Sequence, residues 1–226
     1  GNIISVTDAA GRTTYTQYDE FNRPVRIVGP EFTDAKYGVI RPVTRYAYNL
    51  LGFLTQVDAG RTTDPLNKAQ DVVTTQQTNL YDDFGRKLKD IDGAGRAWVY
   101  AYNTAGDVTT VTDPRNKATT QTWNADGTLK TRANEVGTIT YTRDALGLVT
   151  RVNNTNPAYT QDFTYNGQRR LESVRDSRGG KTLYYEYSPA GRLIAMRDNE
   201  GAETNYVYDP LGRLVGLWAA NYDFVT

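Results

Sequence analysis

Cysteine and histidine are both absent from this chain of 226 residues. Their absence excludes disulfides, thiol nucleophiles, zinc sites of the Cys/His type and every catalytic triad that needs an imidazole base. The 26 basic residues balance the 26 acidic ones, so no net field attracts nucleic acid or an anionic membrane. We therefore expect a protein that is not an enzyme and that does not bind nucleic acid.

Long hydrophobic runs are also missing. No stretch approaches the roughly 18 consecutive apolar residues of a membrane-spanning helix, and we expect no membrane insertion. Linkers rich in glycine or serine are absent, as are low-complexity tracts. The chain therefore reads as a single array over residues 1–226.

What the sequence does contain is a repeat: an aromatic residue, Asp or Asn, two variable residues, usually Gly, and then an aliphatic residue, as in NYVYDPLGRLVGLW at 205–218. The anchor positions are Tyr18, Tyr48, Tyr81, Tyr102, Trp123, Arg143, Tyr165, Tyr187 and Tyr208. Their separations are 30, 33, 21, 21, 20, 22, 22 and 21 residues, so six of eight lie within one residue of 21. Such a period indicates a repeat protein.

The spelling of the motif is that of a tight turn. Asp or Asn opens a type I turn by accepting a hydrogen bond from the backbone N–H two residues on, and Gly then takes the positive φ that closes a bulged hairpin. Asn22 and Arg169 stand where two of the repeats lack this Gly. The turn glycines are Gly52, Gly85, Gly106, Gly127, Gly147, Gly191 and Gly212. A second turn follows half a period later, as in IDGAG at 91–95, so we expect one β-hairpin per repeat.

Strands are indicated by aromatic residues that alternate before each first turn, as at Tyr206 and Tyr208. The sequence thus predicts an all-β fold of about nine tandem antiparallel hairpins. Insertions near 28–44 and 61–77 carry prolines, including Pro42 and Pro65, and we expect them to be loops because proline breaks strands.

These repeats resemble the RHS, or YD, repeats, whose consensus YDxxGRL is nearly verbatim in YDPLGRL at 208–214. The resemblance covers essentially the whole chain. It implies a curved, spiralling sheet that builds a hollow shell. In bacterial polymorphic toxins and insecticidal toxin complexes of this family the shell encloses a toxic C-terminal domain, and in teneurins a similar shell belongs to an adhesion receptor.

By this resemblance we expect a non-enzymatic structural segment of a shell that encloses and helps deliver a C-terminal toxin or effector domain. Its partners would be neighbouring repeats and that enclosed domain, in a secreted or cell-surface bacterial protein. The alternative is a cell-surface adhesion or carbohydrate-binding module, because aromatic ladders also stack on sugars. The family's self-cleaving segment uses aspartates in paired DPxG motifs. Only 209–212 has that spelling here, so the protease is not carried over.

The chain offers no evident catalytic, cofactor or metal site. Asp82, Asp144 and Asp209 are spread one per hairpin, whereas calcium loops and acid/base pairs need several carboxylates at one point. Arginines that follow the turn Gly, such as Arg86 and Arg213, are expected to be solvated or to pair with a neighbouring repeat. We also expect self-association, because the terminal strands of an uncapped array expose unpaired edges.

Overall fold

The computed structural model describes residues 2–220 and divides into two compact units, which meet in sequence at Ala118 and Thr119. Strands occupy more than half of the described residues, and the only helix among them is one short 3-10 turn. The predicted all-β fold of antiparallel hairpins is thus confirmed.

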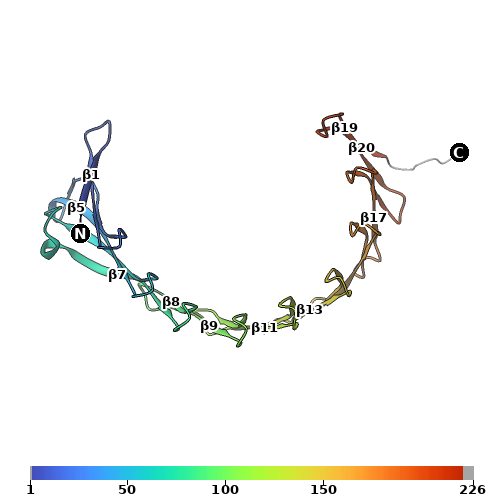
Figure 1. Ribbon diagram of the computed structural model, residues 1–226, viewed down its shortest axis with the longest axis horizontal. Helices are drawn as coiled ribbons and strands as arrows, with labels where there is room; N and C mark the ends of the chain where they lie inside the picture. Colours follow the sequence, from blue (N-terminus) through green and yellow to red (C-terminus); the bar gives the residue numbers. More distant parts are fainter. Residues whose placement is uncertain (1, 221–226) are drawn as a thin grey trace. The chain divides into compact units, whose positions relative to one another are not determined.

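In the first unit each strand pairs antiparallel with the next, except that β3 pairs with β5 instead of β4. Its elements, several of which are labelled in Figure 1, are β1 (Ile3–Thr7), β2 (Thr13–Tyr18), β3 (Pro24–Val28), β4 (Phe32–Asp34), β5 (Gly38–Tyr48), β6 (Leu54–Thr62), the 3-10 helix η1 (Lys68–Gln70), β7 (Val72–Tyr81), β8 (Lys87–Asp92), β9 (Ala97–Tyr102) and β10 (Val108–Thr112).

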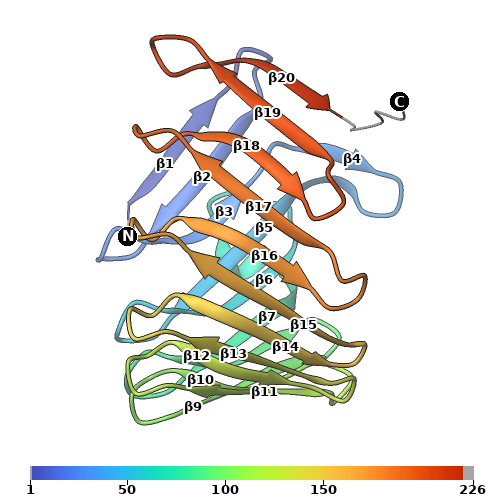
Figure 2. The same cartoon turned by 90° about the vertical axis from the view of Figure 1, so that its right-hand side faces the viewer.

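The second unit is more regular, since every strand pairs antiparallel with its successor. Figure 2 shows β13 to β20 lying side by side in chain order, with the turns at the two ends of the strands. The strands are β11 (Ala118–Trp123), β12 (Leu129–Ala133), β13 (Thr138–Arg143), β14 (Val149–Thr155), β15 (Ala158–Tyr165), β16 (Leu171–Asp176), β17 (Thr182–Tyr187), β18 (Leu193–Asp198), β19 (Glu203–Tyr208) and β20 (Leu214–Ala220).

The hairpin turns have the predicted chemistry. In a representative turn the Asp82 carboxylate accepts hydrogen bonds from the N–H of Phe84 (3.0 Å) and of Arg86 (2.9 Å). The register then shifts by one residue between Leu80 and Tyr81, which is the predicted bulge. All seven turn glycines of the motif have positive φ, between 77° and 95°.

Two non-glycine residues replace the turn Gly and take the same backbone conformation: Asn22 has φ 60° and Arg169 has φ 62°. Asparagine tolerates this region, whereas other L-residues are strained there by about 1–2 kcal/mol. Arg169→Gly relieves this strain, but glycine also gains entropy in the unfolded chain, which offsets part of the gain. We therefore expect the substitution to raise the free energy of unfolding by about 0.5–1 kcal/mol. Urea denaturation measures this change. Asn22→Gly is the control and should shift stability less; a lower urea midpoint for Arg169→Gly would contradict the assignment of strain.

The two insertions depart from the expectation of loops. Residues 38–48 form the long strand β5, and 72–77 belong to β7, so that only 63–71 remains outside strands in the second insertion. Pro42 is accommodated because it lies between the stretch of β5 that pairs with β4 and the stretch that pairs with β3. A missing N–H at that junction removes no ladder bond to those strands.

Buried side chains are few among the described residues and concentrate where these insertions fold against the sheet. Val28, Ile40 and Val43 are buried there, together with Arg26 and Thr62. Elsewhere each unit is a single layer in which most side chains remain half-buried or exposed. The stability of that layer therefore depends strongly on contacts between neighbouring repeats.

Candidate functional site: the seam between repeats

The nine anchor residues occupy one structural position. Each is the last residue of the strand that precedes a motif turn, namely β2, β5, β7, β9, β11, β13, β15, β17 and β19. The next residue, usually Asp or Asn, starts the turn. The side chains of the motif thus repeat along one edge of the strands in each unit, and we call the contacts between successive motifs the seam.

Tyrosine hydroxyls form the first part of the seam. Five of the seven anchor tyrosines donate a hydrogen bond to a backbone carbonyl of the preceding repeat, and the acceptor is always the residue six positions after the preceding anchor. Tyr187, for example, donates to the Leu171 carbonyl at 2.9 Å. The other pairs are Tyr48 with Pro24, Tyr81 with Leu54, Tyr102 with Lys87 and Tyr165 with Val149, at 2.7–3.1 Å.

The side chain five residues after each anchor, which follows the turn Gly or the residue that replaces it, forms the second part of the seam. Arg86 donates from Nε to the carboxylate of Asp82 at 2.6 Å, within its own turn, and its guanidinium lies 4.8 Å from the ring centroid of Tyr102 in the next repeat. Arg23 does the same with Asp19 and Tyr48. Arg213 is solvated as expected, with its side chain 74% exposed. The expected pairing with a neighbouring repeat's carboxylate is wrong, because the fork of the Arg86 or Arg213 guanidinium fits the turn's own Asp. In Arg86 the face of the guanidinium is left for the next tyrosine.

The same guanidinium also reaches the next turn. Arg86 donates to the Asn103 carbonyl at 3.2 Å, and Arg170 approaches the Ser188 carbonyl at 3.4 Å. Where the position is not arginine, an aromatic side chain can replace it: Phe53 stacks on Tyr81 with ring centroids 5.1 Å apart. One side chain thus ties its own turn to the ring, and in these arginines to the backbone, of the following repeat.

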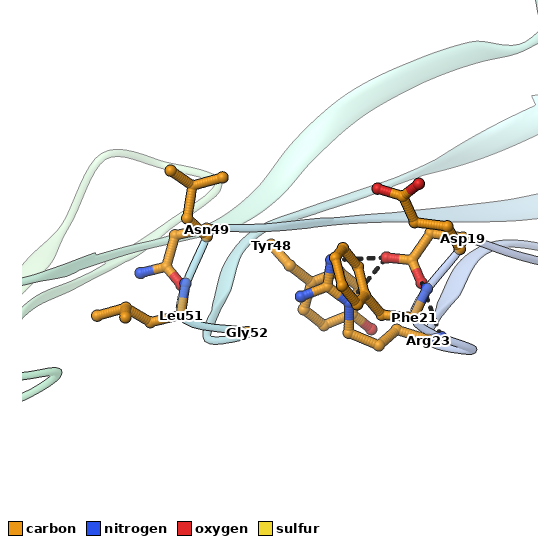
Figure 3. Close-up of a pocket in the computed structure, with 9 residues that line it drawn as sticks. Asp19, Phe21, Arg23, Tyr48, Asn49, Leu51 and Gly52 are labelled. Atoms are coloured by element: carbon orange, nitrogen blue, oxygen red, sulfur yellow. Dashed lines mark hydrogen bonds and ion pairs between the residues drawn. The ribbon is translucent and has the colours of Figure 1, made fainter.

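Grooves lie between successive turns along the seam. The first, of about 570 Å³, is lined by Asp19, Arg23 and Tyr48, by Phe21 and by the turn at 49–52. Figure 3 shows Arg23 beside the Phe21 and Tyr48 rings and bonded to Asp19. A second groove of about 560 Å³ repeats this arrangement at Phe84, Arg86 and Tyr102. The polar groups that line these grooves already bond to one another, so the grooves expose mainly apolar surface.

The repeated aspartates stay apart and serve their own turns. In Asp209 the backbone N–H of Arg213, and next its guanidinium, lower the pKa of the carboxyl below its usual value. That carboxylate is therefore ionised at neutral pH. Within residues 2–220, no group of three Asp or Glu side chains is placed to hold a metal ion. The arrangement is suited to joining strands.

Two anchors differ from the tyrosines. Arg143 replaces the aromatic residue, and its guanidinium donates to the Gly147 carbonyl of its own turn at 3.0 Å. Trp123 ends β11 at the same position. The hydroxyl bonds of the seam were not predicted from the sequence. Tyr at the anchor and Arg five residues later do recur together in the motif, and this recurrence could have indicated a contact between them.

Comparison with known proteins bears on these repeats directly. The model of the RHS repeat family matches residues 1–31, 81–118 and 187–217, each of which contains YD motifs. These three regions, fewer than half of the residues of the chain, thus match the RHS repeat. A search of the curated proteins found no match.

The solved structures that resemble this chain include toxin-complex proteins. The crystal structure of TcdB2-TccC3 without its hypervariable C-terminal region matches at 15% identity and TM-score 0.50, over 96% of this chain and 13% of the other. The Tc holotoxin pore of Photorhabdus luminescens matches at 16% identity and TM-score 0.49, over 96% and 13%. At 15% identity the likeness to TcdB2-TccC3 shows the fold alone, and this chain spans about one eighth of the length of these two proteins.

The described chain is thus a run of antiparallel hairpins, and three regions of the chain match the RHS repeat. Among the described residues, no helix has both the length and the apolar character needed to cross a membrane.

Proposed function

We propose that this segment forms part of the wall of an RHS shell that encloses a C-terminal toxin or effector domain of a secreted or cell-surface bacterial protein. The observation that supports it best is the seam, which recurs from repeat to repeat and joins each hairpin to the next by side chains as well as by the strand ladder. A wall must resist opening between strands, and the hydroxyl bonds at five of the joints oppose such opening.

The family match supports the same function. RHS repeats occupy three separate regions of the chain, and the resemblance to TcdB2-TccC3 extends over 96% of it. The grooves found along the seam expose apolar surface around polar groups that are already paired, which favours a structural role over catalysis.

Limited proteolysis of the full-length protein that contains this segment tests the proposal. We expect its C-terminal region to survive protease concentrations that digest the same region expressed alone. A seam variant, Arg170→Ala combined with Tyr187→Phe, should shorten that survival, because it removes the lock between two neighbouring hairpins. Glu172→Ala changes an exposed residue beside the same joint and is the matched control.

Equal digestion of the C-terminal region inside and outside the full-length protein would refute enclosure. The adhesion alternative makes a different prediction: the chain itself would bind defined members of a glycan array. Binding there, together with an unprotected C-terminal region, would favour the adhesion module over the shell wall.

A further inference from the structure

The motif turn between β15 and β16 contains the only Asn-Gly pair in the sequence, Asn166 followed by Gly167. In the other eight motif turns the corresponding second residue carries a side chain. An asparagine loses ammonia when the backbone nitrogen of the next residue attacks its Cγ. Glycine hinders this attack least, because it has no Cβ and its backbone is the most adaptable. The pair therefore places a chemically labile amide in one turn of the array.

Both reacting groups are accessible in this turn. Gly167 is exposed, and within the described chain neither its N–H nor the Asn166 Nδ2 has a hydrogen-bond partner. The Asn166 Oδ1 accepts the N–H groups of Gln168 and Arg170, both at 3.0 Å, and these bonds must break before Cγ can turn onto the Gly167 nitrogen. Such opening is local at an exposed turn, and the positive φ of Arg169, 62°, strains the closed form and favours it.

Another turn of the chain shows the contacts that an aspartate at position 166 would make. Asp92 is followed by glycine, and by arginine four residues later, as Asn166 is. Its Oδ1 accepts the N–H groups of Ala94 at 3.0 Å and Arg96 at 2.9 Å, which correspond to the two bonds of the Asn166 Oδ1. Its Oδ2 accepts the Arg96 Nε at 2.7 Å. Asn166 has the Nδ2 amide in place of this oxygen, and an amide nitrogen cannot accept a bond from a guanidinium.

The residue that starts a motif turn also decides how closely the seam arginine approaches the next repeat. Where the turn starts with Asp, the guanidinium lies 4.6 or 4.8 Å from the centroid of the next tyrosine ring, as in Arg23 and Arg86. Where it starts with Asn or Ser, as for Arg170 and Arg192, the distance is 5.6 or 5.7 Å. A carboxylate in the arginine's own turn thus accompanies a tighter contact between the two hairpins.

We propose that Asn166 is a site of spontaneous deamidation and that its aspartate product holds Arg170 closer to Tyr187, which tightens this joint. The Gly167 nitrogen forms a bond to Cγ, the bond from Cγ to Nδ2 breaks, and ammonia leaves with the proton of the Gly167 nitrogen, so that a cyclic imide remains. Water then adds to Cγ and breaks its bond to the Gly167 nitrogen, which takes up a proton, and aspartate results. Water that adds to the backbone carbonyl carbon of residue 166 gives isoaspartate instead, which lengthens the main chain by one atom and displaces the hydrogen bonds of the turn.

Incubation of the whole chain at mildly alkaline pH, followed by peptide mass spectrometry, tests the modification. We expect Asn166 to acquire the mass of a carboxyl group while Asn49, the matched control, keeps its amide. The Asn49 Oδ1 accepts the corresponding two N–H bonds of its turn, but leucine follows it. Gly167→Ala should abolish the change, and the fold tolerates this variant because a Cβ there meets nothing within 4 Å. A retained amide at Asn166, equal conversion of Asn49, or undiminished conversion in Gly167→Ala would overturn the assignment.

The variant Asn166→Asp tests the effect of the aspartate product on the joint. In urea denaturation it should raise the folding equilibrium constant about two- to fivefold, the contribution of one ion pair at the surface. The gain should vanish in the Arg170→Ala background. Asn49→Asp is the control and should bring no such gain, because phenylalanine stands four residues after it. No gain from Asn166→Asp, or an equal gain without Arg170, would overturn the role of the product. None of these results depends on whether a cargo domain is protected.

Discussion

Asp71→Ala is expected to lower the free energy of unfolding of the first unit by about 3–5 kcal/mol, because it leaves a buried arginine without its counter-charge. The side chains of Asp71 and Arg26 are 0% and 3% exposed and lie 2.7 Å apart. Two hydrogen bonds join the carboxylate to the guanidinium, whose remaining donors reach the carbonyls of Asp64 and Pro65. The pair thereby fastens the second insertion to β3.

Urea denaturation followed by the fluorescence of Trp98, which lies in the same unit, measures the change. Asp8→Ala is the control: it breaks a pair with Arg12 whose side chains are 42% and 68% exposed, together with two hydrogen bonds inside its own turn, and it should cost much less than Asp71→Ala. Replacing both buried partners, as Arg26→Met with Asp71→Leu, should recover much of the loss, since no buried charge is left unpaired and Arg45, which also faces Asp71, keeps Asp58. Similar midpoints for Asp71→Ala and Asp8→Ala would show that the buried pair contributes no more than a surface pair.

The hairpins could be predicted from the sequence because their chemistry is local. Asp82 bonds to N–H groups two and four residues away, and the positive φ of the turn belongs to a glycine three residues after it. Each of these relations lies within a five-residue window, and it recurs with the period. Local relations of this kind can be predicted from a single sequence without a structure.

The seam could be predicted from the sequence only in part. The bond from the Tyr187 hydroxyl to Leu171 spans 16 residues, and the strand register decides which carbonyl it meets. The bulge in each hairpin sets that register, so the acceptor could not be identified before the fold was known. The motif still contained a sign of the seam, since Arg stands five residues after the anchor in each repeat where its guanidinium faces the next tyrosine.

The insertions could not be predicted for a different reason. Arg26 and Asp71 are 45 residues apart, and neither residue belongs to a repeating pattern. A buried ion pair between segments so distant in sequence leaves no periodic signal. The prolines of these insertions indicated loops, whereas tertiary pairing places Pro42 within β5 at a junction where its missing N–H is tolerated.

Gly85→Ala is expected to lower the free energy of unfolding by about 2–4 kcal/mol, more than the same change at Gly106. Both glycines have positive φ, 80° and 95°, so both substitutions carry about 1–2 kcal/mol of backbone strain. At Gly85 a Cβ would also lie 2.5 Å from the Phe53 ring, whereas at Gly106 it would meet nothing within 4 Å. Phe53 must then move from its stack on Tyr81, and a further loss follows from that contact.

The difference in unfolding free energy between these two variants separates the contribution of the seam from that of the turn. Backbone strain is common to Gly85→Ala and Gly106→Ala, so the excess at Gly85 reports the packing of one repeat on the next. Phe53→Ala removes the ring that a Cβ at position 85 would strike, and in that background Gly85→Ala should cost no more than Gly106→Ala. Five urea unfolding curves are needed, those of the unchanged chain, the three single variants and the double variant, each followed by tryptophan fluorescence. An excess at Gly85 that survived the removal of Phe53 would contradict the role assigned to Phe53.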